Sequence, residues 1–113
     1  MPTEGNVHFG RGCFAYDDKL KTIDLSKVDS IIEDETFYGC KSLYSINLAN
    51  VLEIGDYAFS DCSGIASIEM PLVEKIGMGA FSRYETYGGA PLITSITLPN
   101  TLKEIGDGAF LGC

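Results

Sequence analysis

Apolar residues recur along the chain at a spacing of 22 or 23 residues. The most regular markers are five phenylalanines, separated by 23, 22, 22 and 29 residues: Phe14, Phe37, Phe59, Phe81 and Phe110. Each of the first four is followed by an apolar–polar phrase, such as "LYSINL" at residues 43–48. This phrase begins six residues after the phenylalanine in three repeats and twelve residues after it in the fourth. The pattern indicates an internal repeat of 22 or 23 residues with one insertion of six residues.

Three kinds of local pattern follow one another within each repeat. The segment "SINL" at residues 45–48 alternates polar and apolar residues, which predicts a short, half-buried strand. The next segment, "VLEIG" at residues 51–55, has apolar residues three apart and ends at glycine, which suits a second extended or turn-like stretch. The segment "DYAFSDC" at residues 56–62 predicts a single helical turn.

A repeat of this length is not stable by itself. Burying five apolar side chains yields roughly 1.5–3 kcal/mol each, whereas ordering each residue of the repeat costs roughly 1–2 kcal/mol. Stacking buries the exposed faces of the repeats and lets each strand pair with the next one. The sequence therefore predicts a repeat solenoid, α/β or mainly β, with a parallel sheet along one side. The polar residues of its strands are expected to point outward.

We expect residues 1–113 to form a single domain made of such repeats. The boundaries are a partial repeat at 1–13, four repeats at about 14–36, 37–58, 59–80 and 81–109, and a partial repeat at 110–113. Solenoids usually carry polar caps on their terminal repeats, and none is visible in this sequence. The chain thus reads as beginning and ending within a repeat.

The run "L-x-x-I-x-L … I-G-x-x-A-F-x-x-C" resembles the BspA-like class of leucine-rich repeats, and it covers the chain from about Phe9 to Cys113. Departures include Glu33 in place of glycine, Tyr84 in place of cysteine and the six-residue insertion. The resemblance implies a curved leucine-rich-repeat fold, with a parallel sheet on one face and short helical or irregular turns on the other. It also implies recognition or adhesion at the cell surface or outside the cell, since the family includes many surface proteins.

Composition and charge narrow the range of partners. The formal net charge is −8 and the pI is near 4.4, so the surface repels nucleic-acid phosphates and anionic lipid. No apolar run approaches the length of a membrane span. The first residues show neither the basic nor the apolar region of a secretory signal. We expect a protein partner or a glycan, no nucleic acid and no membrane insertion; the compartment is not determined by the sequence.

The cysteines are expected to be buried thiols. Cys40, Cys62 and Cys113 each follow a marker phenylalanine by three residues, so a solenoid places them in one column. Free cysteine behaves as a small buried hydrophobic residue, although a bond between Cys40 and Cys62 is not excluded by the expected distance between coils.

Catalytic, metal and cofactor motifs are not found. His8 is the one imidazole, and it lies in a stretch expected to be frayed, so we expect a solvated side chain. No C-x-x-C, P-loop or dinucleotide motif occurs. The acidic clusters at residues 17–18 and 33–35 lack calcium-loop spacing and suit solvated turns. We expect no enzyme activity and no cofactor.

Two surfaces are candidate binding sites. The first is the outward face of the strands, a row of mostly small polar residues; its candidate contacts are Tyr44, Asn47, Glu69 and Thr97. The second is the insertion at residues 82–91, because insertions in repeats often lie on the binding face; its candidate contacts are Arg83, Tyr84 and Tyr87. Solvent-facing strand residues and a neutral loop are the alternative interpretations.

The favoured function is a non-catalytic recognition module for protein–protein interaction or adhesion. The alternative is an assembly segment of a longer repeat array, which stacks end to end and has no ligand of its own. A carbohydrate-processing β-helix is disfavoured because its acidic residues would have to converge, whereas Asp24 and Glu69 are separated by a whole coil.

Overall fold

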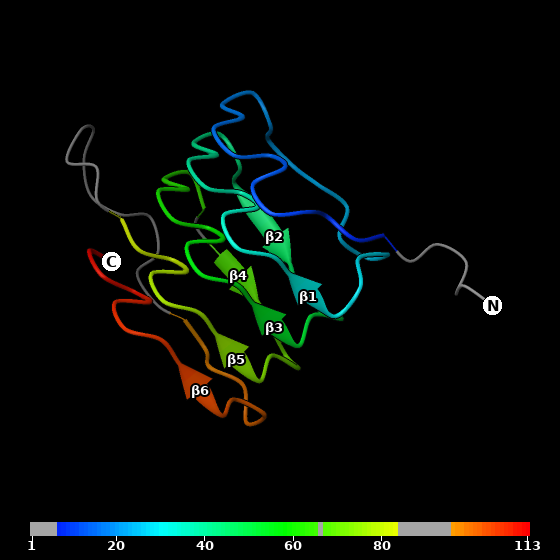
Figure 1. The fold of residues 1–113 in the computed structure, drawn as a ribbon, viewed down its shortest axis with the longest axis vertical. Coiled ribbons are helices and arrows are strands. Elements are labelled where there is room, and N and C mark those ends of the chain that lie inside the picture. The colour runs from blue at the N-terminus through cyan, green and yellow to red at the C-terminus, as the bar shows by residue number, and fades with distance from the viewer. Residues whose placement is uncertain (1–6, 66, 84–95) are drawn as a thin grey trace.

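A computed structural model describes residues 7–65, 67–83 and 96–113. The chain winds through a stack of similar coils (Figure 1). Its strands are two or three residues long: β1 Ile31–Ile32, β2 Ser45–Asn47, β3 Glu53–Ile54, β4 Ser67–Glu69, β5 Lys75–Ile76 and β6 Glu104–Ile105. Turns and irregular segments connect them, and these ranges contain no helix.

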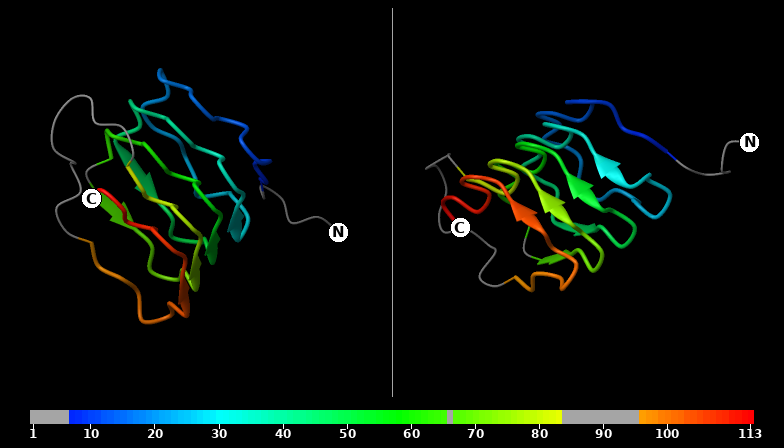
Figure 2. Two further views of the ribbon diagram at one scale, coloured as in Figure 1. Left: turned by 60° about the vertical axis from the view of Figure 1, so that its left-hand side comes forward. Right: turned by 60° about the horizontal axis from the view of Figure 1, so that its bottom comes forward.

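The strands form two parallel sheets on different sides of the coil (Figure 2). One sheet has the order β1-β3-β5-β6, and the other pairs β2 with β4. Equivalent residues of successive coils face one another, so that Ser45 pairs with Ser67 and Ile54 pairs with Ile76. This register confirms the predicted solenoid with parallel strands.

The larger sheet is formed by the second segment of the repeat, the one that the sequence predicted as extended or turn-like. The predicted strand segment gives β2 and β4, but residues 20–25 and 96–98 form no strand. The first two coils are still joined at the start of this segment, where the Tyr44 N–H donates to the Lys21 carbonyl at 3.1 Å. Farther along the segment, a hollow of about 190 Å³ lies between residues 23–26 and residues 47–50. The strand prediction is wrong for residues 20–25 because the first two coils separate on this side.

The third segment of each repeat is a tight turn and not the predicted helical turn. Residues at two offsets of the turns have a positive φ. The first offset, with φ between 57° and 65°, is held by Gly12, Glu35, Tyr57, Gly79 and Gly108, and the second, four residues later, by Tyr16, Gly39, Asp61 and Gly112. A left-handed residue cannot continue a right-handed helix, so the backbone reverses within a few residues. The backbone N–H groups of the turn then donate to carbonyls of the next coil; for example, the Phe37 N–H donates to the Ala58 carbonyl at 2.9 Å.

Close contact between coils explains the glycine of the repeated "IG" phrase. A Cβ atom added to Gly55 or Gly77 would lie 2.6 Å from the backbone of the preceding coil, and Gly106 is equally confined. Glu33 occupies the equivalent position near the N-terminus, where the first coil is held by a bridge between Val7 and Val28. The glycine is therefore a packing requirement wherever one coil lies directly on another.

The phenylalanines form a continuous stack through the core. Successive ring centroids from Phe14 to Phe110 are 5.1–5.5 Å apart, and the ring planes are within 9° of parallel. Phe37 and Phe59 are at most 1% exposed, and buried aliphatic columns surround them. The marker residues thus occupy equivalent places, as the sequence predicted.

Candidate functional site

The outer face of the two-stranded sheet carries three of the predicted contact residues. Tyr44 lies just before β2 and is 54% exposed. Asn47 of β2 pairs with Glu69 of β4, and both side chains are exposed. Thr97 is also exposed, but its segment is not paired as a strand. The structure therefore places Tyr44, Asn47 and Glu69 on one surface, which we name the β2–β4 face.

Asn47 has a structural role on this face. Its Oδ1 atom accepts a hydrogen bond from the Ala49 N–H at 2.9 Å, which closes the turn after β2. One coil earlier, the Asp24 Oδ1 atom accepts the Ser26 N–H at 2.9 Å. Hydrogen bonds from the Ser26 side chain and backbone lower the pKa of the Asp24 carboxyl below its ordinary value. The polar atoms of Asp24 and Asn47 are thus engaged by their own turns.

Glu69 and Thr97 differ from Asp24 and Asn47 because proline follows each of them two residues later. Pro71 and Pro99 have no backbone N–H, so neither turn offers the donor that Asp24 and Asn47 satisfy. The Glu69 carboxylate is therefore not required to close its turn. Of the predicted contacts, Tyr44 and Glu69 are the two best suited to contact a partner.

The predicted loop contacts are described only at the start of the loop. The Arg83 N–H donates to the Leu111 carbonyl at 2.8 Å, so the Arg83 backbone belongs to the regular ladder. Its side chain is half-buried. Tyr84 and Tyr87 lie outside the residues that the structure describes, and their role stays a prediction.

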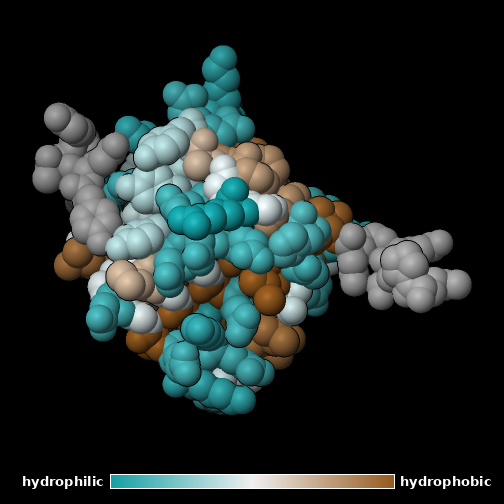
Figure 3. All heavy atoms as spheres, in the orientation of Figure 1, coloured by the Kyte–Doolittle hydropathy of each residue, from teal (hydrophilic) through white to brown (hydrophobic). Residues whose placement is uncertain are grey.

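The face of the four-stranded sheet was not predicted as a surface of interest. It carries complementary charge pairs between coils: Lys103 Nζ lies 3.4 Å from Glu74 Oε1, and Lys75 Nζ lies 3.9 Å from Glu104 Oε2. Figure 3 shows hydrophilic and hydrophobic residues interspersed on this side of the molecule. The aligned phrases "VEKI" and "LKEI" are the sequence signal for these pairs, since opposite charges share each offset. The charged side chains of these two coils are therefore paired with one another across the coils.

Aspartates at the turns are engaged with the backbone and do not form a metal site. Asp34 Oδ1 accepts the Asp56 N–H at 2.8 Å, and Asp56 Oδ1 accepts the Met78 N–H at 2.9 Å. Each carboxylate thereby links one coil to the next. Within the described ranges no group of three or more histidine, cysteine or carboxylate side chains could hold a metal ion.

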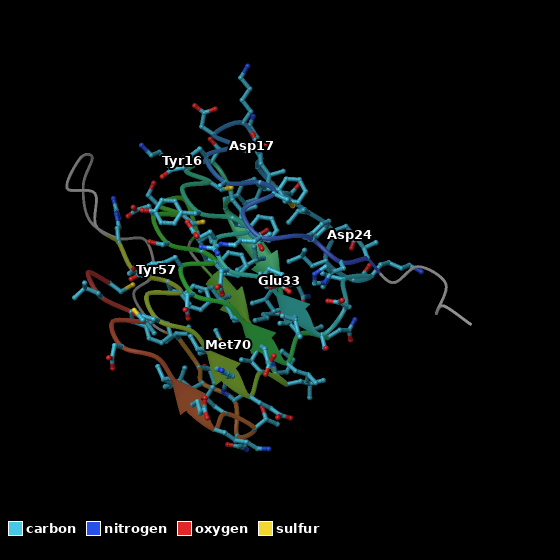
Figure 4. All side chains as sticks on the ribbon, in the orientation of Figure 1. Tyr16, Asp17, Asp24, Glu33, Tyr57 and Met70 are labelled. Carbon is cyan, nitrogen blue, oxygen red and sulfur yellow. The ribbon has the colours of Figure 1, made fainter. Side chains whose placement is uncertain are left out.

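The sequence analysis also did not identify an exposed tyrosine, Tyr16, that packs against the half-buried Tyr38. Tyr16 is 71% exposed and its ring lies 5.3 Å from that of Tyr38. Figure 4 shows Tyr16 and Tyr57 along the side of the molecule formed by the turns. Tyr16 occupies a left-handed position that Gly39 fills in the next coil, and its ring covers that glycine. The tyrosine pair is therefore part of the packing between turns.

His8 is exposed, as predicted, but its segment is held in place. Its Nδ1 atom lies 2.9 Å from Asp29 Oδ2, and its Nε2 atom lies 3.3 Å from Glu33 Oε1. The imidazole therefore connects the first coil to the second where Glu33 replaces the usual glycine. This contact gives His8 a structural role.

The cysteines are free thiols, and the predicted column is present. The Sγ atom of Cys40, Cys62 or Cys113 donates to the phenylalanine carbonyl of the preceding coil at 3.0–3.3 Å. Burial is confirmed for Cys40 and Cys62, whereas Cys113 is exposed. Burial raises the pKa of the Cys40 thiol to about 11 and that of the Cys62 thiol further. These two groups are protonated, unreactive parts of the core.

We expect iodoacetamide to separate the cysteines by burial. In the folded protein at mildly alkaline pH, the exposed Cys13 and Cys113 should react, whereas Cys40 and Cys62 should react only after unfolding in urea. The reason is that the thiolate is the nucleophile, and burial disfavours it. Peptide mass spectrometry measures the modification at each site. Rapid native labelling of Cys62 would contradict its position in the core.

Stacked coils with in-register parallel strands and a buried phenylalanine column define a leucine-rich-repeat solenoid. The sequence model described as "BspA type Leucine rich repeat region" matches residues 7–113 in six copies. The chain therefore belongs to the BspA-type leucine-rich-repeat family.

The chain is also similar to a solved structure, that of a leucine-rich repeat protein from Bacteroides ovatus. The TM-score is 0.74 and the sequence identity is 31%, over 96% of this chain and 28% of that one. The chain thus spans less than a third of the length of that protein. No curated protein gives a significant match.

The described ranges were also searched for membrane-spanning segments. None of their segments is a helix with the length and apolar character needed to cross a bilayer.

Proposed function

We propose that residues 1–113 form one non-catalytic leucine-rich-repeat domain that binds another protein, or a glycan, through the β2–β4 face and the loop at residues 82–91. The exposure of both Tyr44, just before β2, and Glu69, in β4, carries this proposal. Tyrosine is enriched among the residues that dominate binding energy. Stacked parallel strands provide the extended surface on which solenoids bind partners. The acidic character of the chain favours a partner with a basic contact surface.

A matched pair of double variants tests the β2–β4 face. The immobilised protein is screened against purified extracellular proteins and glycans, and binding is measured by surface plasmon resonance. The Tyr44→Ala/Glu69→Gln variant should weaken binding about tenfold or more, because it removes an aromatic anchor and a charge. The control, Tyr16→Ala/Glu53→Gln, makes the same two changes on other faces and should bind as the wild type does.

A third variant tests the loop. Replacing both Tyr84 and Tyr87 with alanine should also weaken binding if the loop borders the partner. Unchanged affinity in this variant would remove the loop from the proposal. Equal affinity of the β2–β4 variant and its control would remove the face.

The second candidate is an assembly segment that stacks end to end. The observation that favours it is the exposure of apolar residues on the last coil: Leu98, Ile105 and Leu111 are 42%, 48% and 52% exposed. Concentration-dependent self-association in solution would support this candidate, and a strict monomer would count against it.

A further inference from the structure

The backbone ladder on the side of the β2–β4 face is interrupted between the first two coils. One coil farther on, the Leu48 N–H donates to the Glu69 carbonyl at 2.8 Å. Leu25 holds the offset of Leu48, but its N–H donates to no backbone carbonyl among the described residues. The Asn47 carbonyl, which it would reach in a regular ladder, receives no backbone hydrogen bond from the described part of the first coil. The hollow of about 190 Å³ lies at this interruption.

Hydrogen bonds between the two coils bound the hollow on both sides. Before it, the Tyr44 N–H donates to the Lys21 carbonyl at 3.1 Å. After it, Asn50 Nδ2 donates to the Ser26 carbonyl at 3.0 Å. The coils therefore separate over a few residues and are joined again. A coil before the first would pair with the opposite edge of residues 23–26, so the hollow does not depend on one.

The lining of the hollow combines buried apolar residues with exposed polar ones. Leu25 is 3% exposed, and Ile23 is half-buried. The exposed lining residues are polar apart from one alanine: Asp24, Ser26, Asn47, Ala49 and Asn50. An apolar surface with a few polar groups that fix orientation is typical of sites that take up a small group.

Asp24 gives the hollow a negative charge. Its Oδ1 atom accepts the Ser26 N–H at 2.9 Å, and this bond orients the carboxylate without neutralising it. A carboxylate has about four acceptor positions, so the group can accept further hydrogen bonds. Within the described ranges no ion pair joins Asp24 to a basic side chain. The hollow therefore favours a cation that also carries several hydrogen-bond donors.

An arginine side chain has this combination of properties. Its guanidinium group is planar and always charged, and it has five N–H donors but no acceptor. Its methylene stem can cover apolar surface while the charged head reaches polar groups. A lysine ammonium is a more strongly hydrated point charge with three donors. The gap between two coils, with a carboxylate and a backbone carbonyl beside it, suits the planar group better.

We propose that the hollow receives an arginine side chain of the protein that binds the β2–β4 face. The guanidinium donates to the Asp24 carboxylate and to the Asn47 carbonyl, and the stem packs against Ile23 and Ala49. Asn47 belongs both to the face and to the lining of the hollow, so a partner on the face lies next to the hollow. Arginine is also enriched among the residues that dominate binding energy. The proposal rests on the proposed function, because the arginine belongs to the partner of that face.

An NMR titration of the isotope-labelled protein tests the hollow without the partner. The probe is the peptide acetyl-Gly-Arg-Gly-amide, and peptides with lysine or glutamine in place of arginine are compared with it. The arginine peptide should shift the backbone amide signals of Leu25, Ser26 and Ala49, with saturation in the millimolar range. The lysine peptide should bind about fivefold or more weakly. The glutamine peptide, which has no charge, should leave these signals unchanged.

Three variants test the assignment of the lining. Asp24→Asn removes the charge but keeps an oxygen that can close the turn, as Asn47 does one coil later; it should weaken binding of the arginine peptide about tenfold or more. Ala49→Leu should also weaken it, because the larger side chain takes up space in the hollow. Glu69→Gln is the matched control: it removes the same charge from the β2–β4 face outside the hollow and should leave the affinity unchanged. A thermal melt should show that each variant is folded.

The results distinguish failure of the hollow from failure of the proposed function. If no amide at the hollow shifts with saturation, the hollow holds water only and the proposal is overturned, while the Tyr44 and Glu69 variants still test the face. Equal affinity for the arginine and lysine peptides, or for wild type and Asp24→Asn, would overturn the assignment to a guanidinium group.

A partner identified in the binding screen tests the second half of the proposal. Asp24→Asn should weaken its binding about tenfold or more, and an unchanged affinity would show that the partner places no arginine in the hollow. If the arginine peptide binds in the hollow but the screen finds no partner, the cation site is supported and the proposed function is overturned.

Discussion

Replacing Phe59 with alanine should destabilise the protein by about 3–5 kcal/mol, the range for large-to-small changes at buried aromatic residues. Phe59 is 1% exposed, and its ring stacks between Phe37 at 5.1 Å and Phe81 at 5.4 Å. The variant loses contacts with both neighbouring coils, and stability in a solenoid depends on those interfaces. Urea unfolding followed by circular dichroism measures the loss. Such a value is a large part of the stability of about 5–15 kcal/mol that is typical of folded proteins.

Phe110→Ala is the matched control for this effect. Phe110 is half-buried and stacks on Phe81 at 5.5 Å on one side, so its removal breaks one described ring contact. We expect its cost to be about half that of Phe59→Ala. Equal losses at the two positions would show that the ring stack does not transmit stability between coils.

The repeat period and the phenylalanine column could be predicted because they depend on identity at equal offsets. Phe37, Phe59 and Phe81 are each preceded by a small residue and an apolar–polar phrase. Stacked coils place such residues in equivalent environments. The sequence therefore predicted correctly the features that depend on which side chain occupies each offset of the repeat.

The sequence predicted less completely the features that depend on backbone conformation, namely the shortest strands and the turns. The segment "VLEIG" forms the four-stranded sheet, but two-residue strands have too little alternation to be recognised. The turns contain Glu35 and Tyr57 in left-handed conformations, which non-glycine residues adopt infrequently. Glu35 and Tyr57 by themselves do not indicate this conformation. Gly12, Gly79 and Gly108 share their offset, so the aligned repeats do indicate a left-handed residue there.

The candidate site was predicted as a row of residues, whereas the structure separates their roles. Asn47 closes a turn by accepting the Ala49 N–H, a role that the sequence analysis did not assign. The sequence signal for this role is the residue two positions later. After Asn47 this residue is Ala49, which has a backbone N–H, whereas after Glu69 it is Pro71, which has none. The presence or absence of that donor divides the row into turn-closing residues and residues available to a partner.

Replacing Gly77 with alanine should destabilise the protein by about 3 kcal/mol, at the upper end of the usual cost of overpacking. Its new Cβ atom would lie 2.6 Å from the carbonyl carbon of Gly55 and a similar distance from Asp56. These are backbone atoms in the middle of the stack, where β3 pairs with β5, so no side chain can rotate away to relieve the contact. Urea unfolding of the purified variant measures the loss, and the midpoint should fall while the fold is retained.

Two further glycine variants separate close contact from backbone conformation. Gly108→Ala retains a φ of 65°, but its nearest new contact is at 3.8 Å, so only the left-handed conformation costs energy, about 1–2 kcal/mol. Gly10→Ala has neither constraint and should be within about 0.5 kcal/mol of wild type. The expected order of losses is therefore Gly77, Gly108 and Gly10. A Gly77→Ala protein as stable as Gly10→Ala would mean that the coils are not in direct backbone contact, and the stacking that positions the β2–β4 face would then be wrong.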